Sequence, residues 1–120
     1  MTPELEIERY SGPMQGHGVL RLKGPLTMEN LSPFQNAVLG EDSTATMILD
    51  LTEVPYIDSA GLGSLMRAYV SRHKAGQRFV LAGVNKRVLK MFEITRVEPL
   101  FLIFPTLEEA VAALTGAANA

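Results

Sequence analysis

One stretch, residues 47–76, constrains the fold of this chain more than any other, because it joins a buried strand to a long helix. Its first part, Met47 to Leu51, is apolar except for Asp50, which is typical of a strand covered on both faces. Apolar residues then recur at the spacing of one helix face: Leu62, Leu65, Met66, Tyr69 and Val70. Arg72 lies off that stripe, and Gly76 can turn left-handed to end the helix. The stretch therefore predicts a central strand followed by a helix that packs on the sheet.

The rest of the chain alternates strand and helix patterns in the order β-β-α-β-α-β-α-β-α. Strands are predicted near residues 1–10, 18–23, 47–51, 79–82 and 100–104, with a helix after each strand from the second onward. This order predicts an α/β fold with a mixed, mostly parallel sheet, about four helices and an antiparallel hairpin at one edge. We expect one domain over residues 1–116 and a short disordered tail at residues 117–120, after Gly116 ends the last helix.

Three helix starts are marked by residues that cap helices. Asn85 and Thr106 each precede an apolar helical pattern, and Glu109 stands at the capping-box position after Thr106. The helix within residues 28–39 has two candidate starts. Thr27 can cap it, with Pro33 then inside the helix, or Ser32 can cap it with Pro33 in the first position.

Composition and motifs argue against an enzyme. The chain has 120 residues, 47% of them apolar, no cysteine and two histidines. The absence of cysteine excludes disulfides, thiolate chemistry and Cys-based metal sites. His17 lies in a glycine-rich turn and His73 at a predicted helix end, so neither suggests a metal site or a general base for Ser59. Gly61-Leu62-Gly63 lacks the spacing and lysine of a phosphate-binding loop. We expect no catalytic residue, no metal and no cofactor.

The expected surroundings of the protein follow from its charge and its apolar runs. A net charge of −2 argues against general nucleic-acid binding. No apolar run approaches the roughly 20 residues that span a bilayer, and the acidic start at residues 1–10 does not resemble a signal peptide. We therefore expect a cytoplasmic protein with no membrane contact, and a monomer.

Ser59 is the candidate functional residue, because its hydroxyl lies at a helix start directly after a buried strand. One interpretation is that Ser59 only caps the helix. The other is that Ser59 accepts a phosphate, which helix-start amides tolerate and which adds about −1.5 to −2 charges at pH 7. If this surface binds a partner, the added charge and bulk would oppose binding without a change in the helix.

The segment from Tyr56 to Gly63, together with Ile48-Leu49-Asp50-Leu51 before it, resembles the STAS domain family. Within that family it is most similar to the bacterial anti-sigma factor antagonists, and the likeness extends from Gly18 to Leu114. The resemblance implies partner switching. The unphosphorylated protein binds an anti-sigma factor that is also a serine kinase, and so releases the sigma factor. Phosphorylation of Ser59 ends the binding, and a PP2C-type phosphatase reverses it.

The resemblance also implies a docking surface, with two departures from the family pattern. Many members have G-E-L-D where this chain has Gly24-Pro25-Leu26-Thr27, and Ala60 replaces a frequent second hydroxyl. The identity of the kinase and of the sigma factor stays open, as do two alternatives: a STAS module that senses an anion or nucleotide at the same helix start, and a scaffold subunit of a signalling assembly. The expected partner-binding residues are Thr27, Asp58, Ser59, Ala60, Gly61, Leu62 and Gly63.

Overall fold

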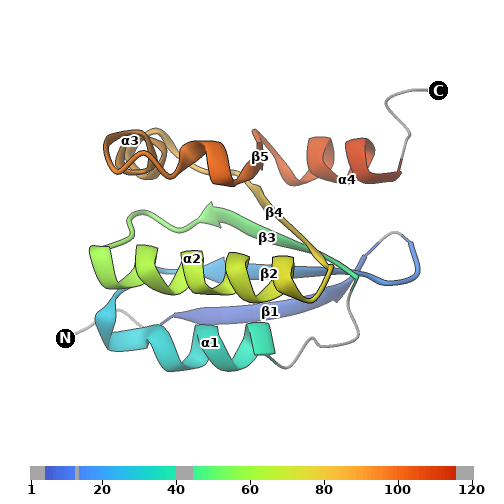
Figure 1. The fold of residues 1–120 in the computed structure, drawn as a ribbon, viewed down its shortest axis with the longest axis horizontal. Coiled ribbons are helices and arrows are strands. Elements are labelled where there is room, and N and C mark those ends of the chain that lie inside the picture. The colour runs from blue at the N-terminus through green and yellow to red at the C-terminus, as the bar shows by residue number, and fades with distance from the viewer. Residues whose placement is uncertain (1–4, 13, 40–44, 116–120) are drawn as a thin grey trace.

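The fold centres on a five-stranded sheet with strand order β1-β2-β3-β4-β5 (Figure 1). The structure is a computed structural model, and it describes residues 5–12, 14–39 and 45–115. β1 and β2 pair antiparallel, and every later pair is parallel, which confirms the predicted hairpin and mostly parallel sheet. The strands are β1 (Glu6–Ser11), β2 (His17–Lys23), β3 (Thr46–Glu53), β4 (Arg78–Ala82) and β5 (Leu102–Phe104).

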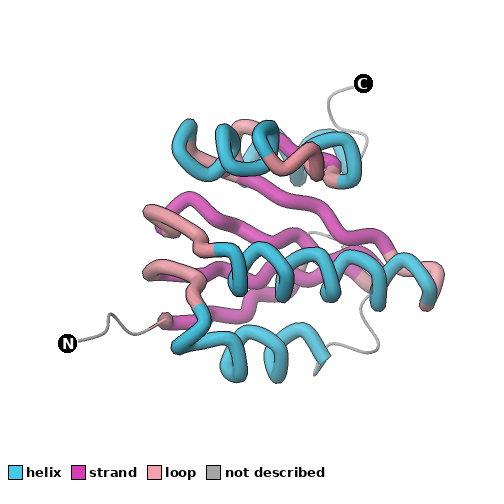
Figure 2. Tube along the Cα trace, turned by 60° about the vertical axis from the view of Figure 1, so that its left-hand side comes forward, coloured by secondary structure: helices cyan, strands magenta, loops and turns pink. Residues whose placement is uncertain are grey.

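Four α-helices follow the predicted order and confirm the α/β fold. α1 and α2 run side by side across one face of the sheet, as Figures 1 and 2 both show. Two short 3₁₀ helices precede α1 and β5. The helical elements are η1 (Met28–Asn30), α1 (Leu31–Leu39), α2 (Ser59–Lys74), α3 (Lys86–Ile94), η2 (Glu98–Leu100) and α4 (Leu107–Thr115).

β3 is buried on both faces, because alternate side chains of a strand point to opposite sides of the sheet. Met47, Leu49 and Leu51 pack in a core with residues of α1, α2 and α3. Ile48 packs in a second core with Val80 and with Ala110 of α4. β3 is therefore apolar because helices cover both faces of the sheet, as the sequence predicts.

The face that α2 buries differs from the predicted stripe, because Ser64 and Ala68 are also buried and two further residues depart from the pattern. Val70 is 44% exposed, whereas Arg72, expected to lie off the stripe, is buried. Arg72 Nη2 donates to the carbonyl oxygen of Val38 in α1 at 3.0 Å, and Nη1 donates to Gln77 Oε1 at 3.1 Å. The prediction for Arg72 is wrong because α2 packs against α1 as well as the sheet, and the guanidinium satisfies a carbonyl near the end of α1.

Arg72→Ala is expected to lower the free energy of unfolding by about 2 kcal/mol, because buried hydrogen bonds from a charged donor would be lost. Lys74→Ala is the matched control, since Lys74 is an exposed cation in the same last turn of α2. Urea unfolding followed by circular dichroism measures both. Equal, small effects of the two substitutions would contradict the structural role of Arg72.

The structure decides between the two predicted starts of the helix within residues 28–39 and confirms the predicted end of α2. Thr27 Oγ1 accepts from the amide of Glu29, and Asn30 Oδ1 accepts from the amide of Thr27, which forms a reciprocal capping box. The Ser32 cap is therefore wrong, and Pro33 lies in the first turn of α1, where its missing N–H removes no needed hydrogen bond. Gly76 adopts a φ of 74°, as predicted.

The fifth strand is shorter than predicted and begins at Leu102, because η2 takes up Leu100, whose amide donates to the carbonyl oxygen of Val97. Two expectations for the chain end, that Gly116 ends the last helix and that residues 117–120 form a tail, lie outside the described residues.

A polar cluster covers the outer face of the hairpin. Glu8 Oε1 accepts from the Tyr10 hydroxyl at 2.8 Å and lies 3.3 Å from Lys23 Nζ. The hydrogen bond from Tyr10 and the charge of Lys23 lower the pKa of Glu8 below its ordinary value. Next to this cluster, Arg21 Nε donates to the buried carboxylate of Asp50 in β3 at 3.1 Å.

Candidate functional site

The loop between β3 and α2, residues 54–58, is held on one side by the segment that follows β2. The amide of Leu26 donates to the carbonyl oxygen of Tyr56, and the amide of Asp58 donates to the carbonyl oxygen of Leu26, each at 3.2 Å. Leu26 and Ile57 accordingly form an isolated parallel bridge. The backbone that leads to Ser59 is thus fixed by residues about thirty positions earlier in the chain.

Asp58, and not Ser59, caps α2. Asp58 Oδ1 accepts from the amide of Gly61 at 2.7 Å, and Oδ2 accepts from the amide of Met28 at 3.1 Å. The interpretation of Ser59 as the helix cap is therefore wrong. Because the carboxylate of Asp58 already satisfies the helix-start amide, Ser59 becomes the first helical residue and its side chain is exposed.

Gly61 permits the close approach of α2 to the loop after β2. A methyl group on Gly61 would overlap the carbonyl oxygen of Leu26 and come within 2.9 Å of Ile57 Cγ2. Gly63 is different, because an added methyl group there would meet only Arg67 Nη1, at 3.7 Å.

On its other side, the loop is held by the start of α3. Asn85 Nδ2 donates to the carbonyl oxygens of Val54 at 3.1 Å and Pro55 at 3.2 Å. Asn85 Oδ1 accepts from the amide of Val88, which confirms Asn85 as the cap of α3. The loop before Ser59 is therefore fixed between two segments that are distant in the sequence.

The structure brings all of the sequence-predicted partner-binding residues to one end of the molecule. Thr27 lies between Leu26 and Met28, both of which bond to the loop. Ser59 is exposed, Thr27, Asp58, Ala60 and Gly63 are half-buried, and Gly61 and Leu62 are buried beneath them. Their role as partner contacts stays a prediction.

A model of the STAS domain family matches residues 5–110, which include every element of the site. The chain belongs to the STAS domain family. The match covers the strand, the capped loop and the helix that carry Ser59, so the resemblance expected from Tyr56 to Gly63 is confirmed.

Two sequence relatives of this STAS domain carry names that refer to anti-sigma factor antagonists. The anti-sigma-B factor antagonist of Listeria monocytogenes is 40% identical over 55 residues, which cover 46% of this chain and 48% of that protein. The match thus spans about half the length of that curated relative. A Thermotoga neapolitana protein, named as a homolog of an anti-sigma factor antagonist, is 30% identical over 94 residues, covering 76% of this chain and 83% of that protein.

A solved structure confirms the fold. The crystal structure of an anti-sigma factor antagonist from Thermotoga maritima superposes with a TM-score of 0.81 at 24% identity. The superposition covers 89% of this chain and 92% of that one. The fold of most of this chain therefore has a counterpart in an experimental structure.

Sequence reasoning missed a groove in the STAS domain between the loop and α3. It has a volume of about 500 Å³, and the guanidinium of Arg87 lies 5.1 Å from the ring centroid of Tyr56 across it. Ile94, 71% exposed, lies at its edge. One feature of the sequence could have indicated the groove: Ile94 is apolar but falls outside the packing stripe of Val88 and Phe92. The groove is lined by Tyr56, Ile57, Asp58, Arg87, Val88, Lys90, Met91 and Ile94.

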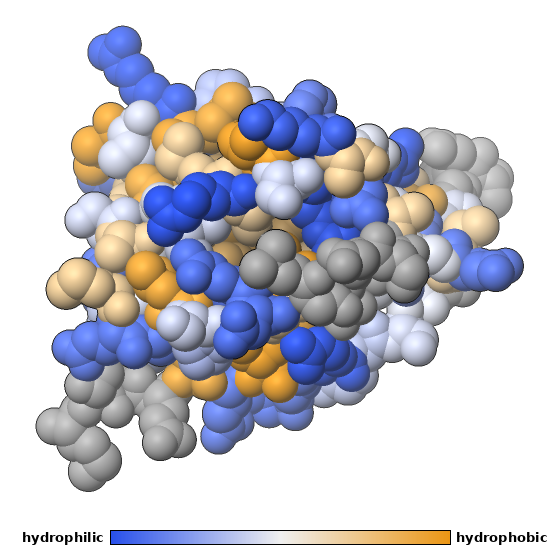
Figure 3. Space-filling model, turned by 60° about the horizontal axis from the view of Figure 1, so that its bottom comes forward, coloured by the Kyte–Doolittle hydropathy of each residue, from blue (hydrophilic) through white to orange (hydrophobic). Residues whose placement is uncertain are grey.

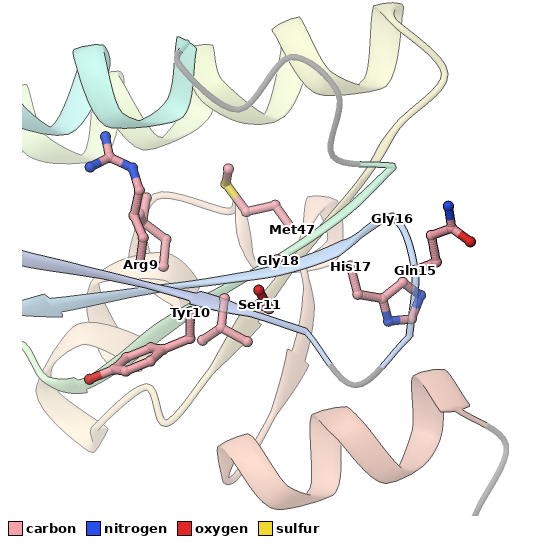
Figure 4. A pocket seen from close by; sticks show the side chains of 10 residues that line it. Arg9, Tyr10, Ser11, Gln15, Gly16, His17, Gly18 and Met47 are labelled. Carbon is pink, nitrogen blue, oxygen red and sulfur yellow. The ribbon is translucent and has the colours of Figure 1, made fainter.

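A second cavity, of about 590 Å³, lies at the opposite end of the sheet, where β2 and β3 begin. Figure 4 shows Arg9 and Tyr10 leaving the sheet on opposite sides, so the lining side chains do not converge on one point. His17 lies in this region, and His73 lies at the far end of α2 from Ser59. Neither histidine is therefore placed to act as a base for Ser59.

Within residues 5–12, 14–39 and 45–115, no group of three or more histidine, aspartate or glutamate side chains could hold a metal ion. None of the helices in these ranges is both long and apolar enough to cross a bilayer.

On the face shown in Figure 3, hydrophobic residues appear as separate groups among hydrophilic ones.

Proposed function

We propose that this STAS domain is an anti-sigma factor antagonist controlled by phosphorylation of Ser59. In its unphosphorylated form it binds an anti-sigma factor that is a serine kinase, and the sigma factor is released in the cytoplasm. The kinase phosphorylates Ser59 and the complex dissociates, and a PP2C-type phosphatase restores the binding form. The protein acts as a monomer and supplies no catalytic residue or cofactor of its own.

One observation carries the proposal: Ser59 is exposed at the first position of α2 while Asp58 makes the cap hydrogen bonds. The Ser59 hydroxyl is therefore not needed to hold the helix, and a kinase can reach it in the folded protein. The loop is fixed from both sides by Leu26 and Asn85, so a phosphate would change the charge of this surface without unwinding the helix. The names of the relatives support the same role.

The effect of a phosphate on binding is electrostatic and steric. It would add about −1.5 to −2 charges beside the carboxylate of Asp58. The amides at the start of α2 partly compensate this charge within the protein. A partner seated over Ser59 would have to desolvate the phosphate without matching it, which opposes binding.

The test compares wild type, Ser59→Ala, Ser59→Glu and Ser71→Glu for affinity to the purified anti-sigma factor serine kinase of the same organism. Ser71→Glu is the matched control, because Ser71 is an exposed serine near the other end of α2. We expect Ser59→Glu to weaken binding at least tenfold, about 1.4 kcal/mol, with the other three alike. The kinase should incorporate phosphate into wild type and not into Ser59→Ala.

Equal binding of Ser59→Glu and wild type would contradict the switch and would favour a scaffold role. A thermal shift produced by added nucleotide, with no affinity for the kinase, would favour a ligand-sensing module instead.

A further inference from the structure

The outer face of α3 is basic at its N-terminal end, where positive charge does not stabilise a helix. Lys86 and Arg87 lie in its first turn, and Lys90 follows one turn later, all three exposed. The positive end of the helix dipole disfavours cations in the first turn, and α3 has no acidic residue there. The helix dipole therefore does not account for these charges, and binding to a partner outside the domain would.

Two of these cations border the groove beside Ser59. Arg87 and Lys90 line it together with Asp58, the residue that directly precedes Ser59. In the part of the chain that the structure describes, neither Arg87 nor Lys90 makes an ion pair. The contact that Arg87 makes is with the ring of Tyr56. Both charges are thus available at the rim of the groove.

The floor of the same groove is apolar. Ile57 and Val88 are buried there, Met91 is half-buried, and Ile94 is exposed. On the other side of Ser59, Met28 is 71% exposed, and its amide is bound by Asp58. A cationic rim around an apolar floor is complementary to a segment that carries both carboxylates and an apolar side chain.

We propose that the docking surface extends from Ser59 across this groove to the outer face of α3, and that the partner inserts an acidic segment with an apolar side chain into it. The inference rests on the proposed function, because it names the chemistry of the partner that the Ser59 surface binds. It commits to a protein partner rather than to an anionic membrane, since the apolar floor is recessed between the loop and α3.

This surface gives the phosphate on Ser59 a direct effect. An acidic segment approaching Arg87 and Lys90 would pass Asp58, where a phosphate on Ser59 adds negative charge of the same sign as the segment. The phosphate would also offset the attraction exerted by the two cations. Binding of the unphosphorylated form should therefore weaken as the salt concentration rises.

The test measures the affinity of the unphosphorylated protein for the purified anti-sigma factor serine kinase at low and high salt. The variants are Arg87→Glu/Lys90→Glu and Ile94→Ser, with Arg67→Glu/Lys74→Glu as a charge-matched control on exposed residues of α2. We expect at least tenfold weaker binding and a smaller salt dependence for Arg87→Glu/Lys90→Glu, weaker binding for Ile94→Ser, and little change for the control. Thermal unfolding should show that all variants remain folded, since the substituted side chains are exposed.

Ser59→Glu in the same assay separates the two proposals. If Ser59→Glu loses the kinase and Arg87→Glu/Lys90→Glu keeps it, the switch stands and the α3 surface is overturned. If neither variant changes binding, both proposals fail. If Arg87→Glu/Lys90→Glu keeps the kinase and instead loses binding to phosphatidylglycerol vesicles, α3 is a membrane surface and the inference is overturned.

Discussion

Gly61→Ala is expected to lower the free energy of unfolding by about 3 kcal/mol, the upper end of the usual cost of overpacking. The added methyl group would overlap the carbonyl of Leu26. That carbonyl cannot move aside easily, because it accepts from the amide of Asp58 while the amide of Leu26 donates to Tyr56. The obstructing atoms are backbone, so rotation of a side chain does not relieve the overlap.

Gly63→Ala, two residues away, is a control for which the free energy of unfolding is expected to rise and not fall. Gly63 is also in α2, and the nearest atom to an added methyl group is Arg67 Nη1 at 3.7 Å. Alanine in a helix interior is favoured over glycine by roughly 0.5–1 kcal/mol, so Gly63→Ala should stabilise the domain by that amount. Urea unfolding of both variants measures the contrast. The same sign for both would show that the contact between Gly61 and Leu26 does not constrain the helix start.

Asp50→Ala is expected to cost about 2–3 kcal/mol of unfolding free energy, the range for losing hydrogen bonds to a buried charged group. The residue is 1% exposed. Its Oδ1 accepts from the amide and the hydroxyl of Thr52 at 3.1 and 2.6 Å, and its Oδ2 accepts from Arg21. Alanine would leave the Thr52 amide without its acceptor and remove the side-chain contact between Asp50 of β3 and Arg21 of β2.

Two further variants test whether this effect comes from the hydrogen bonds of Asp50. Asp50→Asn should also destabilise, because one end of the amide is a donor and cannot accept from both Thr52 and Arg21. Glu53→Ala is the control, since its carboxylate is half-exposed and lies 4.0 Å from Lys23, a contact of little value for stability. Thermal and urea unfolding would measure all three, and full stability of Asp50→Asn would contradict the assignment.

The sequence predicts those parts of the fold that depend on neighbouring residues. The apolar run of β3, the presence of a long helix after it and the caps Asn85 and Thr106 follow from local patterns, and the structure confirms them. Arg72 is different, because its partner Val38 lies 34 residues away on another helix. Periodicity reports which face of a helix is apolar, not which carbonyl of a neighbouring helix needs a donor.

The candidate site also combines features set by neighbouring residues with features set by distant ones. Ser59 and its flanking residues form a continuous motif, so the sequence could place them at a helix start. The cap could not be assigned, because Asp58 and Ser59 are both good cap residues and the choice depends on the Met28 amide, 30 positions away. The groove beside α3 was not predictable, since it forms only where Tyr56 meets Arg87.

The attachment of the loop before Ser59 to two distant segments means that the surface around this serine exists only in the folded chain. Leu26, Asp58 and Asn85 come from three separate parts of the sequence and are brought together by tertiary contacts. A short linear peptide centred on Ser59 contains the motif without that arrangement. An enzyme or partner that requires this arrangement would bind the folded domain and not the unfolded chain.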